Sequence, residues 1–268
     1  MVSSLGGGAA LGRIAGFGRN CERTVGHVTD TQSGRTRRVR AGGVRLAYRV
    51  WGPAEAPPVV LLHALGEAST DWTPVASALA PSWRLYAPDL RGHGASDWPG
   101  SYTIEQLTAD LAAFLDALDL DYVTLCGHSI GGPSAYLYAA RHPERVARLV
   151  LEEPAPPWPR ARRALTRPEG VLPFDWAATT LSNEFADPQV ISWRDSLRHV
   201  QAPVLLIAGG PASHVDQDPL AHMATLIPDC DLVTIPAGHL VHAARLAEFT
   251  AVVTGFLRRP LSACYCRR

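Results

Sequence analysis

Short apolar runs alternate with amphipathic stretches along the chain from about residue 43. Runs rich in Val, Ile and Leu have the length of buried strands, and stretches with apolar residues three and four positions apart have the spacing of helices. The expected strands cover 44–50, 59–62, 83–87, 122–126, 146–151, 203–208 and 231–235. The expected helices cover 71–79, 103–118, 130–141, 219–226 and 243–257. This alternation predicts an α/β fold with a mostly parallel central sheet and helices on both faces.

Between residues 154 and 199 the alternation stops. This stretch is rich in proline and contains five large aromatic residues, Trp158, Phe174, Trp176, Phe185 and Trp193. We interpret 154–199 as a short helical lid inserted over one end of the sheet, in which the aromatic residues form a packed core. The body of the fold is then expected in two segments, 41–153 and 200–260.

The two ends of the chain differ from the body. Residues 1–40 are punctuated by glycine and carry seven Arg against two acidic residues, with a weak apolar pattern. Such segments do not bury enough apolar surface to fold. We therefore expect residues 1–40 to form a disordered extension and residues 261–268 to form a frayed tail.

Composition and charge narrow the classes of function. All 25 basic residues among the 268 are arginine, which excludes Schiff-base chemistry on lysine and a phosphate-binding P-loop. In segment 41–257, 14 Arg against 23 acidic residues give a net charge of −9, whereas both ends are basic. An acidic body argues against a nucleic-acid partner. No apolar run approaches the ~20 residues of a membrane-spanning helix.

The cysteines and the absence of cofactor motifs complete this picture. The five cysteines show no metal-ligand spacing, and their low number is typical of a reducing compartment. We expect a cytoplasmic protein, monomeric or homodimeric, that acts on a small-molecule substrate. We expect no nucleic-acid or membrane partner, and neither a metal nor an organic cofactor.

A candidate nucleophile lies in the motif GHSIG at residues 127–131, between the strand expected at 122–126 and the helix expected at 130–141. Strand, sharp turn and helix are the setting that a G-x-S-x-G nucleophile elbow requires. Side chains at the two glycine positions would collide with neighbouring elements, and the turn projects the serine hydroxyl above the sheet. The motif predicts Ser129 as the nucleophile and the amide of Ile130 as a donor to a tetrahedral oxyanion.

With this motif, the chain from about 43 to 257 resembles the α/β-hydrolase-fold family, which includes esterases, haloperoxidase-like enzymes and C–C bond hydrolases. Three further segments carry the resemblance: 62–66 (LHALG), 89–96 (DLRGHGAS) and Gly238-His239. It covers about four-fifths of the chain. The resemblance implies the α/β-hydrolase fold and gives the segment at 89–96 no chemical role.

The resemblance also implies two more members of the site. The amide of Leu65 corresponds to the second oxyanion donor, although Ala64 stands where the family usually has glycine. His239, which follows the last expected strand, corresponds to the base that takes the serine proton. His242 is the main alternative to it. His128 is adjacent to Ser129, but we expect its side chain to diverge from the serine.

The acid that orients the histidine is harder to place. The family usually carries an aspartate at the position of Ala212, which cannot accept a hydrogen bond. Some family members carry the acid one strand earlier, where this chain has Glu152 and Glu153. Adjacent strand residues point to opposite faces, so only one of the two can face the site. Glu153 matches the family position better and is our candidate.

Two aspartates of the later loop remain alternatives. Asp216 would have to reach back through a reshaped loop. Asp218, which precedes Pro219, has the pattern of a helix N-cap.

Together these features predict a serine hydrolase. The predicted triad and oxyanion hole consist of Ser129, His239 and Glu153 with the amides of Leu65 and Ile130. The aromatic lid favours a small, mostly apolar ester or related acyl compound, cleaved through an acyl-enzyme. An acyltransferase or perhydrolase on the same triad is one alternative. A low-turnover ligand-binding protein on a hydrolase fold is another, motivated by the two alanines at expected functional positions.

Overall fold

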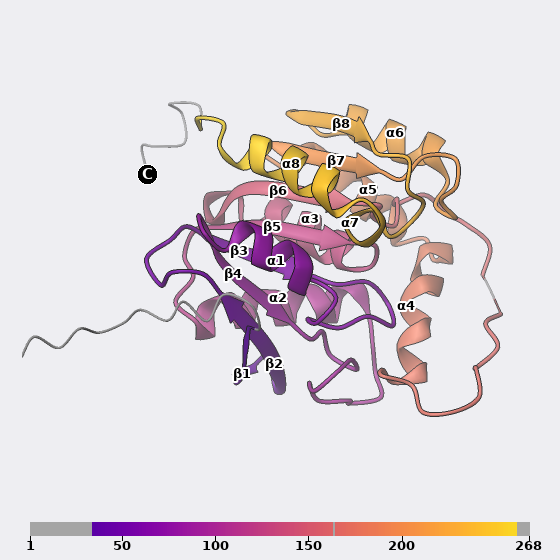
Figure 1. The fold of residues 1–268 in the computed structure, drawn as a ribbon. Coiled ribbons are helices and arrows are strands. Elements are labelled where there is room, and N and C mark those ends of the chain that lie inside the picture. Colours follow the sequence, from indigo (N-terminus) through magenta and orange to yellow (C-terminus); the bar gives the residue numbers. More distant parts are fainter. Residues whose placement is uncertain (1–33, 163, 262–268) are drawn as a thin grey trace, which may run out of the picture.

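The computed structural model describes residues 34–162 and 164–261, and a mixed β-sheet forms their centre (Figure 1). Within these ranges eight strands lie in the order β1-β2-β4-β3-β5-β6-β7-β8. The pairs β1–β2 and β2–β4 are antiparallel, and all later pairs are parallel. The strands are β1 (Arg35–Ala41), β2 (Val44–Trp51), β3 (Pro58–Leu62), β4 (Arg84–Pro88), β5 (Val123–His128), β6 (Val146–Glu152), β7 (Val204–Ala208) and β8 (Cys230–Thr234). The predicted α/β class with a mostly parallel sheet is confirmed.

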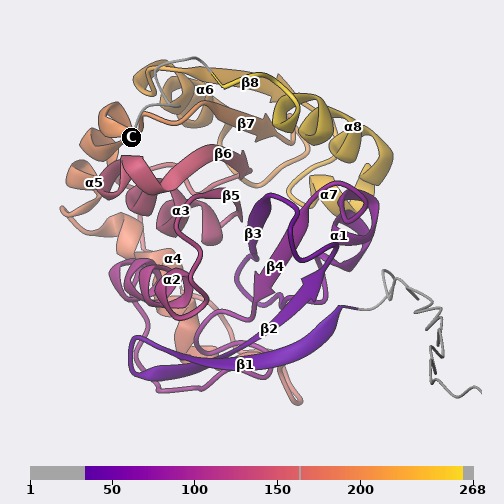
Figure 2. The ribbon, with the colours of Figure 1, turned by 90° about the vertical axis from the view of Figure 1, so that its left-hand side faces the viewer.

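Helices cover both faces of this sheet (Figure 2). One face is covered by α1 (Thr73–Leu79), α7 (Val241–Ala244) and α8 (Leu246–Leu257). The other is covered by α2 (Ile104–Ala117), α3 (Gly131–Arg141), α5 (Val190–Ser196) and α6 (Gln217–Leu226). Val59 and Leu61 of β3 pack on the first layer, and Val60 and Leu62 pack on the second, as strand alternation requires. In the described part of the chain, no helix has the length and apolarity needed to cross a membrane.

Strand β1 corrects the predicted boundary of the N-terminal extension. The expected extension ran to residue 40, but Arg35–Ala41 pairs with all of β2 up to Val50. The turn between them is Gly42-Gly43, with φ of +56° and +89°, which suits a two-residue hairpin turn. The alternation was hard to see because β1 is an edge strand whose described arginines are exposed, and only Val39 and Ala41 of its described side chains reach the core. Residues 1–33 and 262–268 lie outside the described residues.

The segment between β6 and β7 begins over one end of the sheet, beside α4 (Thr180–Asn183), and ends on one face, where α5 packs against α3 (Figure 1). It contains α4 and α5, with short 3₁₀ turns at Trp176–Thr179, Glu184–Ala186 and Leu197–His199. A further 3₁₀ turn, Pro143–Arg145, precedes β6. Phe185 and Trp193 are buried and meet edge to face, with ring centroids 5.5 Å apart. Aromatic contacts of this kind hold the segment together.

A buried carboxylate attaches this segment to the body. Glu184 is 8% exposed, and its Oε1 accepts a hydrogen bond from the Ile104 amide at the start of α2 (3.0 Å). Gln189 Nε2 donates to the other oxygen at 3.2 Å. Burial raises the pKa of Glu184 to about 7, and the hydrogen bond from Ile104 only partly offsets it. Glu184 therefore gains a proton on folding over the range between its ordinary pKa of 4.5 and about 7.

This shift predicts a pH-dependent gain in stability from Glu184→Gln. Because the folded protein binds the extra proton, wild-type stability falls as the pH rises from about 4.5 to about 7. Glutamine keeps an acceptor for Ile104 but does not ionise. We expect the melting temperature of the variant, relative to wild type, to be higher at about pH 8 than at about pH 5.

The matched control is Glu169→Gln, an exposed glutamate of the same segment. Its melting temperature should differ from wild type by the same amount at both pH values. An equal difference for Glu184→Gln at both pH values would contradict the prediction.

Candidate active site

Ser129 occupies a sharp turn between β5 and α3. Its φ is +51°, a left-handed conformation that a non-glycine residue adopts only where the surroundings enforce it. The Ser129 amide donates to the Glu152 carbonyl (3.1 Å), and the Ser129 carbonyl accepts from the Gly132 amide (3.1 Å). These bonds join the turn to the end of β6 and to the first turn of α3.

The glycines of the turn are required by close backbone contacts. A Cβ at Gly127 would lie 2.6 Å from the Gly131 carbonyl oxygen, and one at Gly131 would lie 2.6 Å from the Leu62 carbonyl oxygen. Atoms other than hydrogen do not approach each other this closely without a hydrogen bond or a covalent bond. The G-x-S-x-G spacing therefore follows from the packing of α3 against β5 and β3.

A cavity of about 470 Å³ opens above Ser129. Its wall at the end of the sheet includes Ser129, Ile130, Leu65 and His239. The segment over the sheet contributes an apolar wall, made up of Ala155, Pro156, Trp158, Pro159 and Leu165. Parallel α/β sheets bind ligands at the carboxyl ends of their strands, and the cavity lies at that end.

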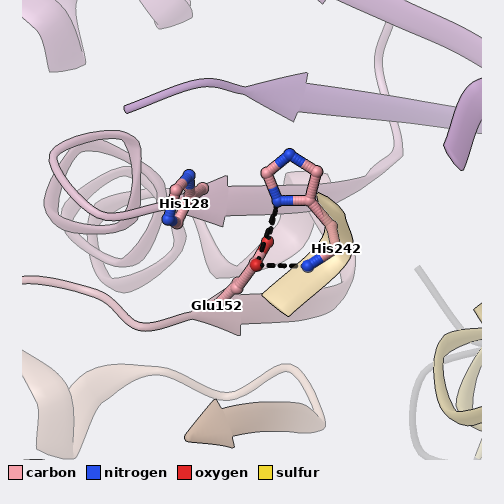
Figure 3. A group of neighbouring side chains, drawn as sticks. All are labelled: His128, Glu152 and His242. Carbon is pink, nitrogen blue, oxygen red and sulfur yellow. Dashed lines mark hydrogen bonds and ion pairs between the residues drawn. The ribbon is translucent and has the colours of Figure 1, made fainter. Parts of the chain in front are cut away.

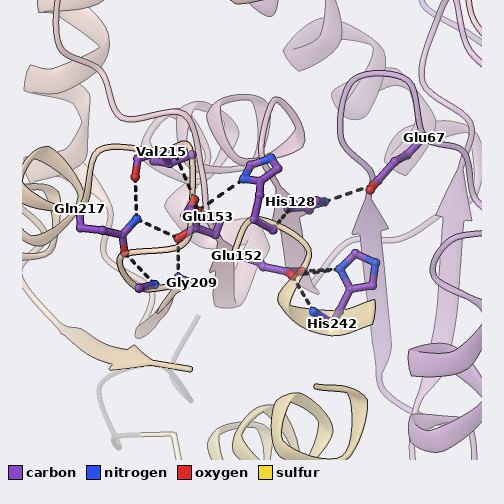
Figure 4. Close-up of polar contacts among 11 residues, drawn as sticks. Glu67, His128, Glu152, Glu153, Gly209, Val215, Gln217 and His242 are labelled. Atoms are coloured by element: carbon purple, nitrogen blue, oxygen red, sulfur yellow. Dashed lines mark hydrogen bonds and ion pairs between the residues drawn. The ribbon is translucent and has the colours of Figure 1, made fainter. Parts of the chain in front are cut away.

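Strand β6 ends at Glu152, and Glu153 follows it directly with its side chain on a different side (Figure 4). Glu152 accepts from the backbone amide of His242 (2.8 Å) and from its Nδ1 (2.9 and 3.0 Å to the two oxygens; Figure 3). Both residues are buried, and the His242 ring stacks on Trp72 at 4.5 Å between centroids. His242, the alternative base in the sequence, is therefore paired with Glu152 below the cavity wall.

Glu153 points instead toward His239. Its Oε2 lies 3.4 Å from His239 Nδ1, and the Glu153 side chain is fully buried. A carboxylate only accepts, so Nδ1 carries the proton and Nε2 is left as the basic nitrogen. Residue 153 has φ +44°, which turns its carboxylate back over the end of the sheet.

Donors from the loop after β7 hold the Glu153 carboxylate (Figure 4). The Gly209 amide and the Gln217 Nε2 donate to Oε1, and the Ser213 hydroxyl donates to Oε2. Burial by itself would raise the pKa of Glu153, but the hydrogen bonds from His239, Ser213 and Gly209 outweigh it, so the pKa lies below its ordinary value. Glu153 is thus held ionised beside His239.

The two aspartates of that loop have other partners. Asp216 is the N-cap of α6, where its side chain accepts from the Asp218 amide at 3.2 Å. The expectation that Asp218 forms this cap is wrong by two residues, because α6 begins at Gln217, before the proline. In the described part of the chain, neither aspartate is a hydrogen-bond partner of His239.

Comparison with known proteins identifies the family. The model of the α/β hydrolase fold matches residues 57–206, more than half of the chain. The chain belongs to the α/β-hydrolase-fold family. It is 30% identical to lipase LipV of Mycobacterium tuberculosis over 253 residues, covering 78% of this chain and 97% of that protein. It is 27% identical to 3-oxoadipate enol-lactonase 2 of Acinetobacter baylyi, covering 82% and 95% of the two chains.

Solved structures and shorter matches agree with this assignment. The structure described as Est816, an N-acyl homoserine lactone degrading enzyme, superposes with a TM-score of 0.70 at 27% identity, covering 82% of this chain and all of that one. Three uncharacterised mycobacterial proteins are also similar to this chain, with 39% identity over 110 residues. The matched part spans only 32% of the length of these curated relatives. The prediction of an α/β-fold hydrolase is confirmed at the level of the family.

In this member of the α/β-hydrolase-fold family, the loop after β3 is fixed by a buried histidine. The Leu90 amide donates to His63 Nε2 (2.9 Å), so His63 Nδ1 carries the proton and donates to the Ala64 carbonyl (2.7 Å). Ala64 is 4% exposed, so its methyl group is accommodated in the wall beside Leu65. The segment at 89–96 is likewise internally bonded, with Asp89 accepting from the amides of Ser69 and Ala95.

Two neighbours of the site were missed in the sequence. His214 was not among the predicted site residues, but its ring centroid lies 4.1 Å from that of His239, and it lines the cavity. Glu67 was not considered, although it lines the cavity and contacts His128. The place of His214 could have been inferred from its loop, which also holds Glu153. Nothing in the local sequence around Glu67 indicates that its partner is His128.

One described group has the composition of a metal site. His128, Glu152 and His242 offer ligand atoms within 4.8 Å of one another. The hydrogen bonds do not fit an ion, because Glu152 accepts from His242 and both His128 nitrogens face oxygen acceptors, Glu67 Oε2 and the His239 carbonyl. An imidazole that donates from both nitrogens has no lone pair for a metal.

The packing of the turn predicts opposite effects for two Gly→Ala substitutions in helices. Gly131→Ala places a methyl group against the Leu62 carbonyl, and we expect a loss of about 1–3 kcal/mol in the free energy of unfolding. Gly255→Ala in α8 meets nothing within 4 Å, and we expect a gain of up to ~1 kcal/mol from helix propensity. Urea unfolding of both variants measures the difference, and equal effects would contradict this account of the turn.

Proposed function

We propose that this protein is a serine hydrolase that cleaves small, mostly apolar esters or lactones through an acyl-enzyme. The observation that carries the proposal is the arrangement of Ser129 and His239 on one cavity wall, with the Glu153 carboxylate facing His239 Nδ1. The proposed oxyanion donors are the amides of Leu65 and Ile130, two residues that line the same cavity.

The reaction follows from the roles of these groups. His239 Nε2 takes the Ser129 proton as Oγ attacks the carbonyl carbon, and the oxyanion is stabilised by the two amides. Collapse of the tetrahedral intermediate breaks the ester bond, and His239 returns the proton to the leaving alkoxide. Water then attacks the acyl-enzyme with His239 again as the base, which releases the acid and regenerates Ser129. Glu153 stabilises the imidazolium in both steps.

The substrate class is inferred from the cavity and from the relatives. A volume of about 470 Å³ is within the range of small-molecule sites, and the apolar wall that includes Trp158 and Leu165 suits an acyl chain. Relatives of this chain are named as a lipase and an enol-lactonase, and a solved neighbour is described as degrading an N-acyl homoserine lactone. All three names concern esters or lactones.

Hydrolysis of p-nitrophenyl butyrate tests the proposal. Ser129→Ala should reduce turnover to the background rate. Glu153→Gln should lower kcat by about 10²–10⁴-fold, because an amide does not stabilise the imidazolium and can reverse the histidine tautomer. Asp216→Asn, which changes the other candidate acid, should lower kcat by less than about tenfold.

A fluorophosphonate that labels activated serines is the accompanying readout. We expect labelling of wild type and none of Ser129→Ala. A larger loss in Asp216→Asn than in Glu153→Gln would refute the assignment of the acid. Wild type that neither turns over nor labels would instead support a binding protein on a hydrolase fold.

A further inference from the structure

Beneath the cavity lies a second set of ionisable residues that the proposed reaction does not use. His128 and Glu152 are fully buried, and His242 is 2% exposed (Figures 3 and 4). Glu67 is beside them, with 17% of its side chain exposed. Buried ionisable groups are costly unless they are paired, so the contacts among them show what each one does.

His128 is held between two acceptors. Its Nε2 lies 3.0 Å from the His239 carbonyl oxygen, which only accepts, so Nε2 donates. Its Nδ1 lies 3.2 Å from Glu67 Oε2. The same Glu67 oxygen accepts from the Ala64 amide at 3.0 Å, as an ionised carboxylate would. With both nitrogens donating, His128 is an imidazolium.

The surrounding charges favour this state. Four ionisable groups face His128: Glu67 from the loop after β3, Glu152 from β6, and the rings of His239 and His242, whose centroids are 4.7 and 5.2 Å away. Burial alone would lower the pKa of His128, but Glu152, Glu67 and the His239 carbonyl raise it to about 9. Burial would raise the pKa of Glu67, but the bond and charge of His128 bring it to about 2.

The resulting chain of bonds joins two parts of the proposed site. It runs from the Ala64 amide, next to Leu65, through Glu67 and His128 to the main chain of His239. We propose that His128 is a positioning residue. Together with Glu67, it holds the loop after β3, which carries Leu65, at a fixed separation from the loop after β8, which carries His239. This inference rests on the proposed function, since it assigns His128 a part in that reaction without contact to substrate.

His128 can donate both of its hydrogen bonds only while it is protonated on both nitrogens. When one proton is lost, one nitrogen becomes an acceptor and faces an oxygen, so one of the two loops is released. Displacement of catalytic groups by about 1 Å can cost about 100-fold in rate. The consequence is an alkaline loss of kcat that a Ser-His-acid triad by itself does not produce.

The test is the pH dependence of kcat and KM for p-nitrophenyl butyrate from about pH 6 to about pH 10.5. Wild-type kcat should fall about tenfold per pH unit above about pH 9, with KM little changed. His128→Gln should have a kcat about 10- to 100-fold lower near neutral pH, without the alkaline fall. The control His199→Gln, an exposed histidine, should match wild type throughout.

A second variant keeps the test valid if His128→Gln does not fold. Glu67→Gln keeps an acceptor for Ala64 but removes the charge beside His128, so the alkaline fall should begin at least about one pH unit lower. A wild-type kcat that is flat to pH 10, or an alkaline fall that persists in a folded His128→Gln, overturns the inference. Circular dichroism at each pH separates this loss from unfolding.

Nitrogen NMR of ¹⁵N-histidine-labelled protein tests the inference without turnover. His128, assigned from His128→Gln or, if that variant does not fold, from the signal perturbed in Glu67→Gln, should be protonated on both nitrogens at neutral pH and should lose one proton near pH 9. A neutral His128 at pH 7 overturns the inference even if the protein is an active hydrolase. If His128 is doubly protonated but fluorophosphonate does not label the protein, the proposed function is refuted. The assignment of His128 as an imidazolium is then still supported.

Discussion

The site depends on the close packing of the turn at Ser129 against the ends of β3 and β6. Backbone atoms of Gly131 and Leu62 approach so closely that no Cβ fits between them, and the Ser129 amide is bonded to the carbonyl of Glu152. The Ser129 main chain is therefore held where the parallel strands β3, β5 and β6 end side by side. Glu152 is the last residue of β6, and Glu153 follows it with a φ of +44°.

These two glutamates form two histidine pairs with different environments. Glu153 is reached by donors from the loop after β7 and faces the cavity through His239, whereas Glu152 is enclosed with His242 under Trp72. Replacing a buried ion pair by apolar residues is often neutral or stabilising, so such pairs are weak evidence for stability. Their arrangement around Ser129 is better explained by the need to fix the position and tautomer of the two histidines.

How much was predictable depends on how local each signal is. The turn at Ser129 is encoded within five consecutive residues, and strand alternation restricted the acid at the end of β6 to one of two glutamates. Strand β1 was missed because an exposed edge strand shows little apolar alternation, although the Gly42-Gly43 pair between two such runs is a hairpin signal. The contact of Glu67 with His128 joins residues 61 positions apart and leaves no pattern in either segment.

The position of the acid changes the role of the loop after β7. The family's usual acid position in that loop is Ala212, and the loop instead donates Gly209, Ser213 and Gln217 to a carboxylate that comes from β6. Three donors and burial constrain Glu153 more tightly than a single bond to His239 would. The same loop places His214 against the ring of His239 at the cavity wall. In the proposed triad, the acid that follows β6 still faces the histidine, and the loop after β7 supports this carboxylate instead of supplying it.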